Sequence, residues 1–186
     1  MRIIAGTKRG AVFAAPPGTL TRPTADRVRE AVFSSLGSVE GLAVLDLFAG
    51  SGALALEALS RGAARAQMVE NRIGAVRTIA RNITKLGFEN AVFSRRDYLA
   101  FLKDAAKKQL RFDLIFVDPP YRMHRAAGPE LKRWLPAVLA PGGRVVIEFD
   151  VRQDVDLPFT LLADKLYGDI RIRIYRAEEQ GSQENQ

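Results

Sequence analysis

The chain has 186 residues, 47% of them hydrophobic and 26% charged, which is typical of a globular protein with one main domain. It has no cysteine, which excludes disulfides and thiolate metal sites, and its one histidine, His124, argues against a histidine-built metal site or a Ser-His-Asp triad. The net charge of +7 favours a polyanionic partner. The chain shows neither a signal peptide nor an apolar run long enough to span a membrane, so we expect a cytoplasmic protein with no membrane partner and no metal.

The first forty residues precede the regular part of the pattern. Residues 2–5 and 11–14 flank a glycine-rich turn and predict a small β-hairpin. Residues 24–36 carry apolar side chains at helical spacing and predict a helix, with Thr24 as its N-cap and Gly37 as its end.

Positive charge is concentrated in this N-terminal part. The basic residues that we consider candidates for contact with phosphates are Arg2, Lys8, Arg9, Arg22 and Arg27. For any one of them the simpler interpretation is a solvated charge. Arg29 is better explained by an ion pair with Asp26 or Glu30.

From residue 42 onward the pattern alternates between strands and helices. The predicted strands are residues 42–47, 66–69, 91–94, 112–117 and 144–149, and the predicted helices are residues 53–60, 73–86, 98–108 and 129–139. A proline–glycine turn is expected at residues 141–143. This alternation predicts an α/β fold with a mostly parallel sheet and helices on both faces. Residues 159–166 and 170–176 flank a short turn and predict a closing antiparallel hairpin.

A glycine-rich loop at residues 46–52 follows the first strand and opens a helix. Small residues let the backbone approach a ligand closely, and the helix N-terminus offers free amides. Residues 50–55 fit the G-x-G-x-x-A fingerprint, and Glu70 ends the next strand, where a carboxylate can accept the hydroxyls of a ribose. The pattern predicts a nucleoside-containing cofactor, with a ligand-free glycine turn as the alternative.

Two other carboxylates favour S-adenosylmethionine over a nicotinamide cofactor. Asp46 precedes the glycines, where it suits a cationic ligand better than a pyrophosphate. Asp97 follows the third strand, where it can accept from an adenine amino group or simply cap the next helix. The candidate cofactor-binding residues are Asp46, Phe48, Ala49, Gly50, Ser51, Gly52, Glu70, Asn71, Asp97 and Tyr98.

The strand at residues 112–117 is followed directly by Asp118, Pro119, Pro120 and Tyr121. Two prolines fix φ, remove backbone donors and stiffen the loop. A carboxylate before them and an aromatic ring after them can hold a flat amino group, with the ring stacked on its plane. These four residues are the candidate catalytic residues, although a plain strand-to-loop turn is the simpler alternative.

In this order, the glycine loop, Glu70, Asp97 and residues 118–121 resemble class I S-adenosylmethionine-dependent methyltransferases that act on amino groups. The N-terminal segments at residues 2–10 and 22–33 narrow the resemblance to the RsmD-type family of bacterial 16S rRNA guanine-N2 methyltransferases. It extends to about residue 177 and is weakest over residues 151–166.

The resemblance implies a Rossmann-like, seven-stranded methyltransferase sheet and methylation of the N2 amine of a guanine in 16S ribosomal RNA. We expect a methyltransferase domain at residues 38–177, preceded by an extension at residues 1–37 whose basic residues favour RNA binding. The polar composition at the C-terminal end predicts a disordered tail at residues 178–186. The expected partner is ribosomal RNA or a partly assembled small subunit, and we expect a monomer. The alternatives are a DNA adenine-N6 methyltransferase and a nicotinamide-dependent oxidoreductase.

Overall fold

The computed structural model describes residues 1–16, 23–120 and 123–179. The predictions made for Arg22, Tyr121 and residues 180–186 therefore lie outside the described residues. Within the described part, no helix is long and apolar enough to cross a membrane.

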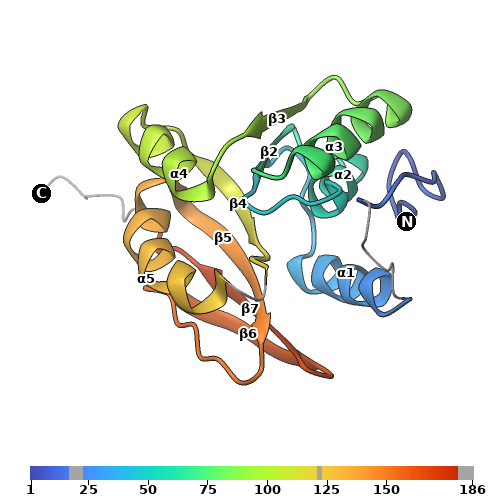
Figure 1. Cartoon of the computed structure of the whole chain (residues 1–186). Coiled ribbons are helices and arrows are strands. Elements are labelled where there is room, and N and C mark those ends of the chain that lie inside the picture. The colour runs from blue at the N-terminus through green and yellow to red at the C-terminus, as the bar shows by residue number, and fades with distance from the viewer. Residues whose placement is uncertain (17–22, 121–122, 180–186) are drawn as a thin grey trace, which may run out of the picture.

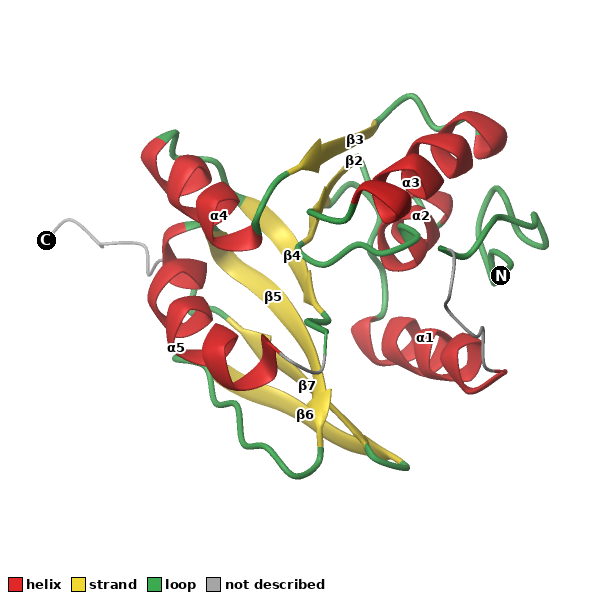
Figure 2. Cartoon of the chain, viewed as in Figure 1, coloured by secondary structure: helices red, strands yellow, loops and turns green. Residues whose placement is uncertain are grey.

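A single sheet forms the centre of the described structure, and Figure 2 shows its strands between two groups of helices. Its seven strands run in the order β3-β2-β1-β4-β5-β7-β6. Their bounds are β1 (Ala43–Asp46), β2 (Arg65–Glu70), β3 (Ala91–Arg95), β4 (Phe112–Val117), β5 (Leu139–Asp150), β6 (Thr160–Tyr167) and β7 (Ile170–Arg176). Strands β1 to β5 pair in parallel, whereas β7 pairs antiparallel with β5 and β6. The predicted α/β class and the antiparallel closing hairpin are confirmed.

Helices cover both faces of the sheet, as Figure 1 shows. They are α1 (Pro23–Leu36), α2 (Ala53–Ser60), α3 (Ile73–Leu86), α4 (Tyr98–Lys107) and α5 (His124–Trp134). Side chains alternate along β4, so that Leu114 and Phe116 pack with α1, α2 and α3, while Ile115 and Val117 pack with α4 and α5. Strand β4 is thus buried on both faces, as its continuous apolar run predicts, whereas the edge strand β3 is largely exposed.

The prediction of a helix at residues 129–139 is wrong at both ends. Helix α5 begins at His124, contains Pro129, and gives way to a short 3₁₀ helix, η2 (Leu135–Ala137). The turn expected at residues 141–143 lies inside β5, beside a register shift against β4. Pairing with β4 and burial of Leu139 therefore outweigh the local turn preference. Helix α1 begins at Pro23, so Thr24 lies in its first turn and is not the cap.

The predicted N-terminal hairpin forms as a single antiparallel bridge between Arg2 and Val12 and not as two strands. Its backbone bonds join Ile3 N–H to the Ala11 carbonyl (2.9 Å) and Gly10 N–H to the Ile3 carbonyl (2.8 Å). Ile3 and Phe13 are buried with α1 and α2, so this short segment depends on packing against the helices.

Candidate active site

A cavity of about 750 Å³ opens at the carboxyl ends of β1, β4 and β5. Parallel α/β sheets bind ligands at this edge, where the connections diverge. The glycine loop, the end of β2 and the start of α4 form one side. Helix α1 and the turn between β6 and β7 form the other.

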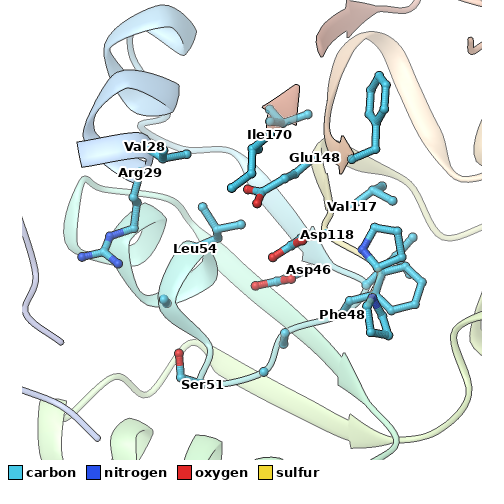
Figure 3. A pocket seen from close by; sticks show the side chains of 18 of the residues that line it. Val28, Arg29, Asp46, Phe48, Ser51, Leu54, Val117, Asp118, Glu148 and Ile170 are labelled. Atoms are coloured by element: carbon cyan, nitrogen blue, oxygen red, sulfur yellow. The ribbon is translucent and has the colours of Figure 1, made fainter. Parts of the chain in front are cut away.

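Three carboxylates from three adjacent strands meet in this cavity. Asp46 ends β1, Asp118 follows β4, and Glu148 lies near the end of β5. Strand alternation places all three on the face that carries Phe116, and Figure 3 shows their carboxyl groups turned toward one another. The sequence predicted Asp46 and Asp118 as site residues but did not single out Glu148.

Burial raises the pKa of all three groups, and repulsion from neighbouring carboxylates adds to the rise for Asp46 and Glu148. Burial, with smaller contributions from Asp118 and Glu70, raises the pKa of Asp46 to about 7. Burial and the charge of Asp118 raise that of Glu148 to about 8. Asp118 is exposed to the open cavity, but the enclosing walls still desolvate it and raise its pKa to about 6. A ligand that is cationic or rich in N–H donors relieves this repulsion.

The glycine loop lies at the Asp46 end of the cavity. Phe48, Ala49, Gly50 and Ser51 line it directly. Gly52 adopts a positive φ of 82° before α2, and a Cβ atom there would lie 2.9 Å from the Met68 sulfur. The close packing of loop on β2 therefore requires glycine at this position.

Glu70 is held in place by the groups around it. Its carboxylate accepts hydrogen bonds from the backbone N–H of Gly50 (3.0 Å), Asn71 (3.0 Å) and Arg72 (2.9 Å), and it pairs with the Arg72 guanidinium. This carboxylate ties the end of β2 to the glycine loop. Because the Arg72 side chain is 64% exposed, it can swing aside and free acceptor positions for a ligand.

Asp97 and Tyr98 have different places at the start of α4. Asp97 is not among the described residues that line the cavity, and it caps α4 by accepting from Leu99 N–H (2.9 Å) and Ala100 N–H (3.1 Å). Tyr98 lines the cavity, and its ring lies 4.9 Å from that of Phe48. The two rings form an apolar wall beside Asn71, the other predicted residue at this end.

The loop after β4 forms the floor of the cavity near its centre. Asp118, Pro119 and Pro120 all line it, with Pro119 buried and Pro120 exposed. The Pro120 carbonyl accepts from Met123 N–H (2.7 Å), which fixes the way the chain enters α5. The structure therefore brings the described residues of this motif to the same cavity as the glycine loop.

The basic N-terminal residues lie outside the cavity. Among the described residues, Arg2, Lys8, Arg9 and Arg27 have no ion-pair partner, and all but the half-buried Lys8 are exposed. Arg29 is buried and pairs with Asp26 at 3.0 Å, as predicted. Its guanidinium also donates to the Arg2 carbonyl (2.6 Å), so it connects α1 to the N-terminal segment.

Sequence reasoning missed Glu148, Arg72 and Arg96 as residues of the cavity. Glu148 could have been found from its position, since it interrupts an apolar strand at the carboxyl end of a parallel sheet. The described residues contain no group of acidic and histidine side chains suited to hold a metal ion.

The strand order, with a glycine loop after β1 and an acidic motif after β4, defines a Rossmann-like class I methyltransferase fold. Residues 1–176 match the model of the family described as "Conserved hypothetical protein 95", and the chain belongs to that family.

The chain is 37% identical to "Putative rRNA methyltransferase YlbH" of Bacillus subtilis, over 95% of this chain and 98% of the relative. It is 36% identical to "Ribosomal RNA small subunit methyltransferase D" of Escherichia coli, over 97% of this chain and 92% of the relative. A solved structure, "Putative methyltransferase yhhF from Escherichia coli", superposes with a TM-score of 0.82 at 35% identity, covering 97% of this chain and 99% of that one.

Proposed function

We propose that this protein transfers a methyl group from S-adenosylmethionine to the N2 amine of a guanine in 16S ribosomal RNA. The observation that carries the proposal is the placement of Asp46 and Asp118 on adjacent strands of one cavity, between the glycine loop and the open side. The names of relatives that match nearly the full chain support ribosomal RNA as the substrate. That substrate implies a cytoplasmic enzyme.

The cavity suits S-adenosylmethionine by its residues. Asp46 offers a carboxylate to a cationic ligand, Gly52 permits close backbone packing, and the Phe48 and Tyr98 rings provide an apolar wall. Glu70 is the proposed acceptor for ribose hydroxyls. One carboxylate oxygen of Asp97 caps α4, so only the other oxygen is available to accept a hydrogen bond from the adenine amino group, as we propose. When bound, the cofactor supplies an electrophilic methyl group on a sulfonium sulfur.

Asp118 and the Pro119 carbonyl orient the guanine N2 amine in this proposal. The amine lone pair is delocalised into the base and is a poor nucleophile. Accepting its N–H groups favours a more pyramidal nitrogen and stabilises the positive charge that develops during transfer. The proton then leaves to Asp118 or to water. We propose that Tyr121 stacks on the base. A paired guanine must leave its stack to reach the cavity.

The N-terminal residues 1–37 are the proposed RNA-binding extension of a methyltransferase domain at residues 38–177. Arg2, Lys8, Arg9, Arg22 and Arg27 are proposed to meet phosphates. The substrate is ribosomal RNA alone or within a partly assembled subunit, and the enzyme is proposed to act as a monomer.

The test begins with calorimetric titration of the protein with S-adenosylmethionine and, separately, with NAD. Binding of the first alone, followed by methyl transfer to 16S ribosomal RNA and mass-spectrometric detection of N2-methylguanine, supports the proposal. Binding of NAD alone points to an oxidoreductase, and N6-methyladenine in DNA points to an adenine methyltransferase.

Asp118→Ala separates chemistry from cofactor binding. We expect turnover to fall by about 10²-fold or more, because a transition-state acceptor is removed. The affinity for S-adenosylhomocysteine, measured by calorimetry, should stay within about threefold of the wild-type value. Equal loss of both properties would assign Asp118 to cofactor binding.

A further inference from the structure

Glu148 is a cavity-lining carboxylate to which the proposed reaction gives no role. Strands β4 and β5 pair Val117 with Ile147, so the next residues, Asp118 and Glu148, are neighbours across the two strands. Adjacent strands lie about 4.8 Å apart, and strand alternation points both side chains to the same face. Figure 3 shows the two carboxyl groups turned toward the same space.

No donor satisfies these two carboxylates within the described part of the chain. Burial and the charge of Asp118 are the influences on the pKa of Glu148, and neither a hydrogen bond nor a cation offsets them. The same holds for Asp118, where burial alone raises the pKa. Asp118 is exposed and Glu148 is half-buried, so solvent reaches both in the open cavity, but the partial desolvation of two adjacent charges still costs free energy. A ligand that brings two adjacent N–H donors removes that cost.

The strand order decides which ligand group each carboxylate meets. Along the sheet, Asp46 on β1 lies nearest the glycine loop, Asp118 after β4 comes next, and Glu148 on β5 is farthest from that loop. If Asp118 holds the reacting amine, Glu148 meets the part of the base beyond it.

The space around Glu148 suits the faces of a flat base. Apolar side chains line it from two elements: Val28 and Val32 from α1, and Ile170 and Ile172 from β7. Figure 3 shows Ile170 near Glu148 and Val28 farther away on α1, while the Arg29 guanidinium turns away toward the N-terminal segment. A flat ligand in this space must therefore carry the N–H donors that meet Asp118 and Glu148 on its edge.

We propose that Glu148 is the residue that selects guanine, by accepting the N1–H of the base next to the N2 amine held by Asp118. This inference rests on the proposed function. Guanine presents two adjacent donors, N1–H and N2–H, along its Watson–Crick edge. Adenine and cytosine present a ring-nitrogen lone pair beside their amine, which an ionised Glu148 repels. Sites built to bind a substrate N–H reject analogues that lack it.

Guanine binding is then linked to release of a proton from Glu148. With a pKa of about 8, the group is mostly protonated in the empty cavity at neutral pH. Donation from N1–H favours the ionised form, so the proton leaves to solvent. Because the protonated form could donate to the lone pair of another base, selection for guanine should increase as pH rises through about 8. Among the described residues, the other charged side chains that line the cavity are Asp46, Asp118, Glu70, Asp150, Asp169, Arg29, Arg72 and Arg96, and the amino-terminal Met1 lines it as well.

The test compares two RNA substrates with the wild-type enzyme and with Glu148→Gln. One is a 16S ribosomal RNA fragment that contains the methylated guanine identified by mass spectrometry, and the other carries 2-aminopurine at that position. 2-Aminopurine keeps the N2 amine but has a lone pair at N1. We expect the wild type, assayed at pH 9 where Glu148 is ionised, to prefer the guanine RNA by about 10²-fold or more in kcat/KM. Glu148→Gln should reduce that preference at least about tenfold, because the glutamine amide can donate to the N1 lone pair.

Equilibrium binding of the two RNAs in the presence of S-adenosylhomocysteine should shift in the same direction. Because 2-aminopurine also lacks O6, the change caused by the Glu148 substitution carries the test. Asp169→Asn, which removes a charge from the exposed rim of the same cavity, is the matched control and should keep the wild-type preference.

An unchanged preference in Glu148→Gln would overturn the role of Glu148 while leaving the proposed function intact. If that variant fails to fold, Glu148→Ala decides, since it must also lose preference. A wild-type enzyme that methylates no guanine in 16S ribosomal RNA would overturn the proposed function and this inference together.

Discussion

Asp46, Asp118 and Glu148 place three carboxyl groups on one face of three adjacent strands, where burial opposes their charge. A group whose pKa is raised on folding binds its proton more tightly in the folded state. Stability therefore falls as pH rises from the unfolded-state pKa to the folded-state pKa. For Glu148 this interval extends from 4.5 to about 8. Such a cluster lowers the stability of the free protein, and its charges are compensated only when a ligand binds.

Glu148→Gln should therefore raise the melting temperature at pH 9 and leave it nearly unchanged at pH 4. At pH 9 the wild-type group is ionised in both states and suffers the full burial cost, whereas at pH 4 it is mostly protonated in both. About 1 kcal/mol corresponds to about 2–4 °C in a chain of this size. Thermal melting followed by circular dichroism measures the shift.

Asp118→Asn should also raise the melting temperature at pH 9. The double variant should gain less than the sum of the two single gains, because each substitution removes the same repulsion. A lower melting temperature for Glu148→Gln at pH 9 would mean that Glu148 accepts a stabilising hydrogen bond in the free protein.

At the scale of elements, the N-terminal segment is attached to α2 by buried polar side chains. Glu57 is fully buried and accepts from the backbone N–H of Ile4 (2.8 Å) and Ala5 (3.0 Å). Ser60 donates to the Ala5 carbonyl and accepts from Lys8 N–H (3.0 Å). A Cβ at Gly6 would lie 1.7 Å from the Ser60 carbonyl oxygen, so only glycine permits this close approach. The segment that carries the proposed phosphate-binding residues is thus fixed to the methyltransferase sheet through α2.

Glu57→Ala should release this segment before the rest of the molecule unfolds. It leaves the Ile4 and Ala5 N–H groups and the Arg61 guanidinium without their acceptor, which we expect to cost about 3 kcal/mol or more. Hydrogen exchange should show reduced protection at residues 3–10 with β4 unaffected. Glu40→Ala, at an exposed position, is the control. A uniform decrease in protection across the sheet would contradict local release.

At the scale of the whole molecule, the unpaired part of the net charge of +7 is distributed unevenly. Much of the basic charge is neutralised within the fold, since Arg29, Arg61 and Arg173 pair with acidic side chains. The N-terminal Lys8 and Arg9 have no described acidic partner. Unpaired basic side chains that project from an attached segment are suited to a phosphate backbone.

Lys8→Glu with Arg9→Glu should weaken binding to 16S ribosomal RNA and reduce the salt dependence of that binding. For every phosphate that the protein no longer neutralises, the slope of log K against log salt should decrease in magnitude by about 1. Affinity for S-adenosylhomocysteine should not change. Lys107→Glu with Lys108→Glu makes the same charge change at the end of α4, across the sheet from the N-terminal segment, and should have little effect (Figure 1). An equal decrease in RNA affinity in both double variants would indicate general electrostatic attraction and would contradict a specific role for the N-terminal extension.

The local pattern of apolar residues, glycines and prolines was sufficient to predict most of the helices and strands. The bounds of α2, α3, β4 and β7 are as predicted, because apolar periodicity and glycine ends coincide there. The local pattern failed at α5, whose bounds differ from those predicted. It failed at the start of β5, where pairing with β4 overrides the turn preference. It also failed at the N-terminal hairpin, whose single bridge depends on hydrogen bonds to α2.

The sequence by itself determined the fold class, the glycine loop and the acidic motif after β4, because each is written in contiguous residues with a short-range physical meaning. Only the tertiary structure joined residues far apart in the chain. Strand order placed Glu148 beside Asp118, and packing turned Glu57 into the anchor of the N-terminal segment. Both roles depend on neighbours across the fold. The local pattern marks Glu148 as a charge within an apolar strand, but it does not say which side chains lie beside either residue.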